Sequence, residues 1–172
     1  LSVALVIFSL LIWTGFDLRD GRAKWPKGHS MASLALLGIT ILAGALVAGM
    51  DAGLLYNHYP LMGNGLVPVE YGEAGWLDPF ENPASAQFHH RWIAAVTFGA
   101  VVVLAVKARR RGLHLRGNLV LGAIVAQFIL GIVTLLHGVP VALGGMHQAG
   151  AVVLLGCLLA LLHDESQHRQ TP

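Results

Sequence analysis

Residues 90–111 read HRWIAAVTFGAVVVLAVKARRR, an apolar run bounded by His90 and Arg91 on one side and by a basic cluster on the other. A run with neither alternation nor heptad spacing is typical of a helix that crosses a bilayer, because each backbone polar group is then satisfied within its own segment. The chain contains similar runs at about 1–16, 31–50, 118–136 and 146–162. A span needs roughly 20 residues, so we expect the first run to be truncated and the third and fifth runs to be borderline in length.

The composition supports the same class of protein. Of the 172 residues, 55% are hydrophobic and only 12% are charged, and the mean hydropathy is +0.66. A soluble domain carries about 25% charged residues, roughly twice the proportion found here. The sequence therefore predicts an all-α polytopic membrane protein with five spans, of which the first is truncated.

The loop charges predict how the spans are oriented. Lys and Arg gather between the first and second runs and again between the third and fourth, whereas the loop 51–89 contains neither residue type and carries several Asp and Glu residues. By the positive-inside rule the basic loops are cytoplasmic and the acidic loop lies outside. These basic residues are interpreted as topology signals and contacts to anionic membrane lipid, and no nucleic-acid partner is expected.

The histidines are the candidate functional residues. Most of the nine histidines are predicted to be solvated or interfacial polar groups, in loops and in the tail: His29, His58, His114, His163 and His168. The others fall at predicted outer ends of spans, where an ionisable side chain is costly unless it has a partner or a ligand: His89, His90, His137 and His147. Because His90 and His147 each open a span from the outer side, parallel helices would hold the two side chains at similar depth.

Two neutral imidazoles that face one another can serve as the axial ligands of one haem iron. Small residues one turn along each helix, Ala94 after His90 and Gly150 and Ala151 after His147, would leave room for a flat group. Arg91 stands at the outer boundary, where its guanidinium could pair with a haem propionate.

Alternatives to this ligand pair stay open. His89 competes with His90, because adjacent residues point about 100° apart on a helix and cannot both face the bundle axis. His137 competes with His147. No His-Glu-x-x-His pattern is present that would favour another metal. Small residues four apart, such as Gly44 with Ala48 and Gly122 with Ala126, predict close helix contacts.

Several motifs in this order resemble the haem A synthase family. The similar stretches are AGLLYNHYPLM at 52–62, ENP at 81–83, QFHHR at 87–91, TLL at 134–136, VP at 139–140 and HQ at 147–148. The resemblance covers nearly the whole chain. It departs from the family pattern at Gln87, which stands where the catalytic half of the family has a glutamate, and at His89, where Asn or Asp is frequent.

The resemblance implies a duplicated eight-helix protein, of which this chain would be the C-terminal half preceded by the last helix of the N-terminal half. Residues 1–29 would be that helix and a cytoplasmic loop, 30–163 a four-helix transmembrane bundle that binds haem and carries the outer loop 51–89, and 164–172 a cytoplasmic tail. Because Leu1 lies inside an apolar run, we expect the chain to begin partway through a larger protein.

The function implied by the resemblance is the oxidation of a ring methyl of haem O to a formyl group, which gives haem A for cytochrome oxidase. This half would bind haem b through His90 and His147 and would hold no catalytic residue. Haem O and the catalytic carboxylate would lie in the other half. Candidate partners are membrane lipid, haem O synthase and a second copy of the chain. The expected location is the bacterial plasma (inner) membrane, or the mitochondrial inner membrane in a eukaryote.

Two other functional classes use the same residues. A non-enzymatic membrane cytochrome b would relay electrons through the same histidines, and an upstream homologous unit with a glutamate three residues before its histidine would argue against it. A transporter or a structural subunit would use the histidines for protons or hydrogen bonds, and it predicts no bound haem.

Overall fold

The computed structural model describes residues 2–168 and is helical throughout, with no strand in that part of the chain. The helices are α1 (Ser2–Asp20), α2 (His29–Gly49), α3 (Asp78–Glu81), α4 (Pro83–Arg110), α5 (His114–Leu136) and α6 (Val141–His168), with two 3₁₀ turns, η1 (Ala52–Leu54) and η2 (Gly75–Leu77). All but α3 are long and apolar enough to cross a membrane. This confirms the predicted all-α polytopic membrane fold.

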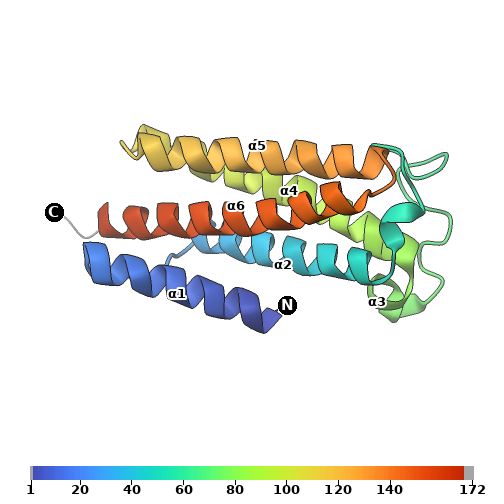
Figure 1. Cartoon of the computed structure of the whole chain (residues 1–172), viewed down its shortest axis with the longest axis horizontal. Coiled ribbons are helices and arrows are strands. Elements are labelled where there is room, and N and C mark those ends of the chain that lie inside the picture. The colour runs from blue at the N-terminus through green and yellow to red at the C-terminus, as the bar shows by residue number, and fades with distance from the viewer. Residues whose placement is uncertain (1, 169–172) are drawn as a thin grey trace.

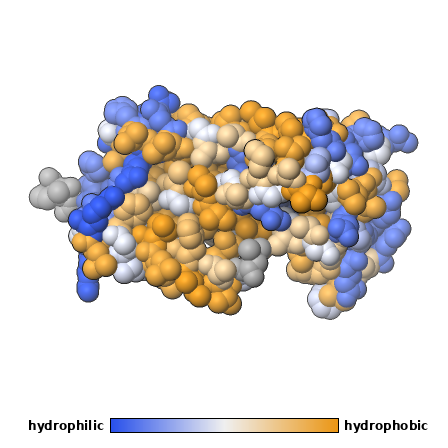
Figure 2. Space-filling model, in the orientation of Figure 1, coloured by the Kyte–Doolittle hydropathy of each residue, from blue (hydrophilic) through white to orange (hydrophobic). Residues whose placement is uncertain are grey.

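The long helices lie side by side, and the segment between α2 and α4 gathers over one end of the bundle (Figure 1). Both predicted cytoplasmic loops lie at the opposite end. Polar residues cover the two ends and hydrophobic residues cover the middle of the molecule, as expected for a protein embedded in lipid (Figure 2). Helices α2, α4, α5 and α6 pack in that order into a bundle, and α1 packs on the outside against α6.

The helix bounds correct the predicted spans. The third run was expected to begin at His90, but α4 begins at Pro83, and α6 begins at Val141 rather than near Met146. The first run, expected to be short, continues to Asp20. Polar and small residues extend these helices beyond the apolar runs, and hydropathy alone does not detect them.

A hydrogen-bonded cap fixes where α4 begins. Asn82 adopts an extended backbone, and its side-chain oxygen accepts hydrogen bonds from the backbone N–H groups of Ala84 and Ser85, at 3.0 and 3.3 Å. Pro83 occupies the first turn, where its missing N–H costs nothing. The cap sets the register of α4 and therefore the positions of the histidines two turns further on.

Tight packing is concentrated in the cytoplasmic half of the bundle. Its core joins side chains of α4, α5 and α6 to Trp13 of α1 and Leu37 of α2. In the outer half the described helices bury few side chains. In α6 no residue before Leu154 is buried, and in α4 none is buried between Gln87 and Thr97. This less buried layer coincides with the level of His90 and His147.

Candidate functional site

His90 projects from α4 toward α2. Its ring lies directly over Gly44, where a Cβ atom would come within 3.0 Å of the ring carbon Cε1. The Nδ1 atom of His90 is buried and has no hydrogen-bond partner. His90 is the eighth residue of α4, so it lies about 10 Å along the helix from the outer end, at about 1.5 Å per residue.

His147 repeats this arrangement on the other side of the bundle. Its ring, on α6, lies over Gly131 of α5, where a Cβ would come within 2.8 Å of Cε1. The amide of Gln127 donates a hydrogen bond from Nε2 to the His147 carbonyl at 2.8 Å and lies 3.1 Å from Nδ1. His147 is the seventh residue of α6, which places it about 9 Å from the outer end of that helix.

The two imidazoles therefore lie at matching depth on helices that start at the same face. Each ring lies against a glycine of the neighbouring transmembrane helix: His90 lies against Gly44 of α2, and His147 lies against Gly131 of α5. At Gly44, where a close approach of helix backbones was predicted, the neighbour is the side chain of His90. Gly122, predicted to make a similar contact, faces open space. Chemically, a pair of neutral imidazoles at one level can ligate a single metal ion.

The competing histidines make different contacts. His89 places Nδ1 2.7 Å from the carbonyl oxygen of Ser85 in its own helix and packs its ring against Tyr71 and Phe88. His137 is exposed and bonds the Val133 carbonyl with Nδ1. Both rings are thus turned to their own helix or to the outer loop.

Arg91 holds the outer loop onto the bundle. Its guanidinium donates hydrogen bonds to the backbone carbonyls of Tyr56, His58 and Leu61, at 2.5, 2.9 and 3.2 Å. Because these carbonyls lie in a single short segment, one side chain fixes the course of residues 56–61 over the helix ends. Its Nε atom is buried and has no partner.

Asp78 organises the rest of that loop. Its carboxylate accepts hydrogen bonds from the backbone N–H groups of Gly72 and Ala74, at 2.8 and 3.0 Å, and from the side chains of Asn82 and Ser85. Burial opposes ionisation of this carboxyl group, but the four hydrogen bonds outweigh burial and lower the pKa of Asp78 to about 2. Nearby, a hydrogen bond to Glu70 raises the pKa of the Tyr56 hydroxyl.

Gln87 lies one turn outward from His90 on the same face of α4. It is buried, and its amide Nε2 donates to the Tyr56 carbonyl at 3.1 Å, while its Oε1 is buried without a partner. An amide is not a proton acceptor at ordinary pH, so this position offers hydrogen bonding and no base.

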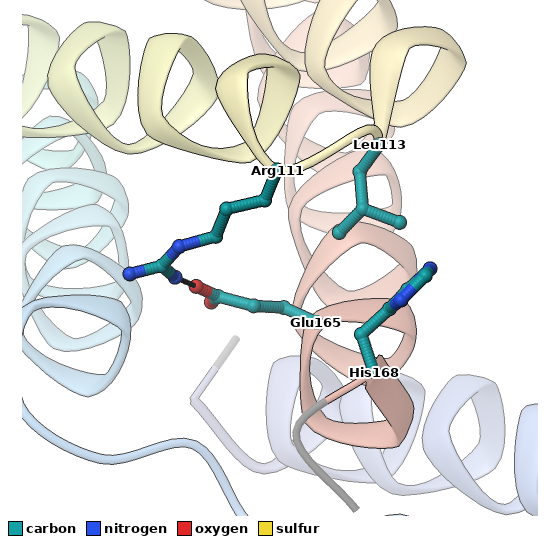
Figure 3. Close-up of a pocket in the computed structure, with 4 residues that line it drawn as sticks. All are labelled: Arg111, Leu113, Glu165 and His168. Atoms are coloured by element: carbon teal, nitrogen blue, oxygen red, sulfur yellow. Dashed lines mark hydrogen bonds and ion pairs between the residues drawn. The ribbon is translucent and has the colours of Figure 1, made fainter. Parts of the chain in front are cut away.

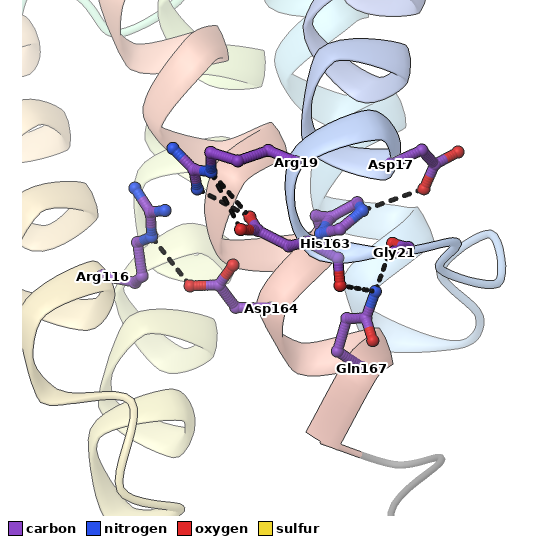
Figure 4. Close-up of polar contacts among 8 residues, drawn as sticks. Asp17, Arg19, Gly21, Arg116, His163, Asp164 and Gln167 are labelled. Atoms are coloured by element: carbon purple, nitrogen blue, oxygen red, sulfur yellow. Dashed lines mark hydrogen bonds and ion pairs between the residues drawn. The ribbon is translucent and has the colours of Figure 1, made fainter.

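A second polar cluster lies at the cytoplasmic end (Figure 4). The prediction that His163 is solvated is wrong: its side chain is 0% exposed, and its Nε2 lies 2.9 Å from Asp17 of α1. The reason is that α6 continues past the apolar run and meets α1, where the His163 ring packs against Trp13 and Phe16. Trp13 in turn stacks on Trp25, with ring centroids 4.8 Å apart.

Charged pairs surround this junction. Asp20, His163 and Asp164 lie within 4.8 Å of one another. The carboxylates are already paired, however, Asp20 with Arg19 at 2.6 Å and Asp164 with Arg116 at 2.8 Å. We interpret the cluster as a joint between α1 and α6, because the two arginines already compensate the charge that a cation would have to neutralise.

Close to this joint, a pocket of about 290 Å³ is lined by Arg111, Leu113, Glu165 and His168 (Figure 3). Arg111 forms an ion pair with Glu165, whose other oxygen accepts a hydrogen bond from Ser30 at 2.7 Å. The pocket lies at the opposite end of the bundle from His90 and His147 and belongs to the packing of the helix ends.

The sequence reasoning missed Gln127 and His163. Gln127 is a single amide within an otherwise apolar run. Because an unpartnered polar group is costly in a bilayer, its presence there could have indicated a specific partner. For His163 the partner lies on a helix distant in sequence, so nothing local indicated its burial.

Known proteins resemble the chain along most of its length. The profile of a cytochrome oxidase assembly protein family matches residues 1–159. Proteins named "Heme A synthase" from Rhodospirillum centenum and Caulobacter vibrioides are 43% and 42% identical over 95% and 93% of the chain. The chain spans about half the length of these curated relatives, 47% and 50%. No solved structure matches it. The relatives are bacterial, and together with the apolar helices they identify a multi-pass protein of the bacterial inner membrane.

Proposed function

This chain belongs to the cytochrome oxidase assembly protein family that contains the haem A synthases, and on that premise we propose that residues 30–163 bind one b-type haem between His90 and His147. The observation that carries the proposal is the matched pair of imidazoles, each lying over a glycine at the same depth in the outer half of the bundle. Bis-histidine ligation from two helices of a bundle is an established way to hold haem.

The surroundings of the two rings fit a flat, largely apolar group. His90 Nδ1 is a buried polar atom without a partner, which is expensive unless the site is completed by something else. The helices bury few side chains at this level, although the same helices are tightly packed toward the cytoplasm. A flat apolar group bound between the two imidazoles would cover part of this less buried surface, which supports a bound group.

The outer loop is the lid of the proposed site. Arg91 holds residues 56–61, and Asn57 ties the same segment to the end of α5 through the Leu135 carbonyl, at 3.0 Å. A loop fixed in this way keeps water from the bundle interior. Arg91 keeps its proposed second role as a partner for a propionate, for which its buried, unpaired Nε is the available donor.

For the whole protein we propose haem A synthase activity, an oxidation of a ring methyl of haem O to a formyl group. A bound haem b would supply one-electron chemistry to this half. The residues of this chain would ligate and orient it, and Gln87, which stands near His90, cannot act as a base. We therefore assign the catalytic carboxylate and haem O to the other half of the full-length protein. The second candidate function for this half alone is a membrane cytochrome b that carries electrons and catalyses no reaction.

Absorption spectroscopy of the protein purified in mild detergent tests the ligand assignment. We expect a low-spin b-type spectrum that is lost in His90→Ala and in His147→Ala. The matched controls are His89→Ala and His137→Ala, which remove neighbouring imidazoles that are turned away from the bundle. A full low-spin spectrum in either ligand variant would rule out the assignment. Sequencing upstream in the parent gene separates the candidates, since a homologous unit with the catalytic glutamate favours the synthase.

A further inference from the structure

Gln127 is a polar side chain in the middle of a membrane helix, and it contacts the ring of His147. Its Nε2 donates to the His147 carbonyl at 2.8 Å and lies 3.1 Å from the ring atom Nδ1. Its other polar atom, Oε1, is buried and has no partner. Polar groups at this depth are costly unless they have a specific task, and the contacts of this amide all go to His147.

The neighbouring residues make room for this amide. A Cβ at Gly150, one turn along α6 from His147, would collide with Oε1 of Gln127. Gly131, one turn along α5 from Gln127, receives the imidazole ring itself. Two glycines thus allow the amide and the ring to lie edge to edge between α5 and α6, and a side chain at either position would separate them.

The direction of the hydrogen bond defines what Gln127 does. The amide Nε2 of Gln127 faces Nδ1 of His147, and a neutral ring that accepts a hydrogen bond at Nδ1 carries its proton on Nε2. A histidine that ligates a metal through Nε2 carries its proton on Nδ1 and donates it to an outer acceptor. The side-chain amide of Gln127 carries the donor Nε2 and the acceptor Oε1 on the same carbon. Rotation about the Cγ–Cδ bond exchanges the two atoms and brings Oε1, which has no partner, toward Nδ1 of His147.

We propose that Gln127 is the positioning residue of His147: it fixes the orientation of the ring at its Nδ1 edge and accepts the Nδ1–H hydrogen bond when Nε2 ligates the haem iron. This inference rests on the proposed haem site. An acceptor on Nδ1–H increases the basicity of the ligand, which favours the ferric state and lowers the reduction potential of the haem.

The two ligands are supported unequally. On α2, the main chain of Thr40, one turn before Gly44, lies against the His90 ring. On α5 the equivalent position, one turn before Gly131, carries the side chain of Gln127. Substituting the side chain of Thr40 leaves its main-chain contact with His90 in place, whereas substituting Gln127 removes the contact with His147. We therefore expect substitutions on the His147 side to change the reduction potential of the haem.

The test is a redox titration and an electron paramagnetic resonance spectrum of the haem in purified full-length protein. We expect Gln127→Leu, which keeps the shape but removes the acceptor, to raise the midpoint potential and shift the low-spin g values. Gln127→Glu, which offers only oxygen to Nδ1–H, should lower the potential. The matched controls are Gln148→Leu and Gln148→Glu, because Gln148 is the next residue of α6 and is exposed. They should leave the g values unchanged and show the effect of charge alone.

Equal potentials in wild type and both Gln127 variants would overturn the inference while the haem site stands. Shifts no larger than those of the Gln148 variants would overturn it as well. If Gln127→Leu loses haem, the Gln127→Glu variant decides. A midpoint potential lowered by more than in Gln148→Glu supports the inference, and a midpoint potential that is not lowered further than in Gln148→Glu refutes it. Wild-type protein that binds no haem would remove the proposed function and the inference together.

Discussion

Replacing Gly131 with alanine tests the central geometry directly. The new methyl group would lie 2.8 Å from Cε1 of His147, whereas ordinary contact begins near 3.4 Å. The ring would have to retreat by about 0.6 Å. It cannot do so freely, because Gln127, on the same helix as Gly131, holds the ring toward α5 through its contact with Nδ1 at 3.1 Å.

Overpacking of this kind costs about 1–3 kcal/mol, which corresponds to a loss of about 5- to 150-fold in affinity. We therefore expect Gly131→Ala to weaken haem binding by that factor, measured by titrating haem into the apo-protein in detergent. Gly122→Ala is the matched control on the same helix, since nothing lies within 4 Å of its new methyl, and its effect should stay within about 0.5 kcal/mol. Equal affinities in the two variants would mean that the imidazole does not lie over Gly131, and the site as described would be wrong.

Further predictions concern the loop and the joint. Arg91→Gln removes most of the hydrogen bonds to residues 56–61, so hydrogen exchange in that segment should accelerate, and unchanged protection would contradict its role as the loop's anchor. Because the pKa of Asp78 is held at about 2, below its ordinary 3.8, its stabilising contribution is complete above about pH 4 and is lost as the pH falls toward 2; melting temperatures should drop over that window more steeply in wild type than in Asp78→Asn. His163→Ala leaves Asp17 without its buried partner and opens a cavity, so thermal stability should fall by about 2–5 kcal/mol while Asp17→Asn, which keeps a hydrogen bond, should cost less.

The spans, and the grouping of basic and acidic loops at opposite ends, could be predicted because both depend on sums over many residues. An apolar run and a cluster of arginines remain recognisable whatever their neighbours do, and the structure places the loops at the ends that the charges indicate. The helix starts were less accessible. Residues 83–89 are not apolar, and only the pairing of Asn82 with Pro83 signalled that α4 begins there.

Contacts between distant helices could not be read from the chain. The placement of His163 against Asp17 depends on how α1 lies on α6, and the role of Gln127 depends on which face of α5 meets His147. Glycines show the same limit: Gly44 and Gly122 sit in similar small-residue patterns, yet one lies under an imidazole and the other faces open space.

The division of the two proposed haem ligands between two helix pairs bears on biogenesis. Since α2 with α4 and α5 with α6 each present one imidazole over one glycine, neither pair inserted alone in the bilayer would supply both ligands of the proposed haem site. The two helix pairs would have to dock against one another in the bilayer before haem could bind between them. Haem absorbance of the membrane would therefore report the packing of the helix pairs and not their insertion.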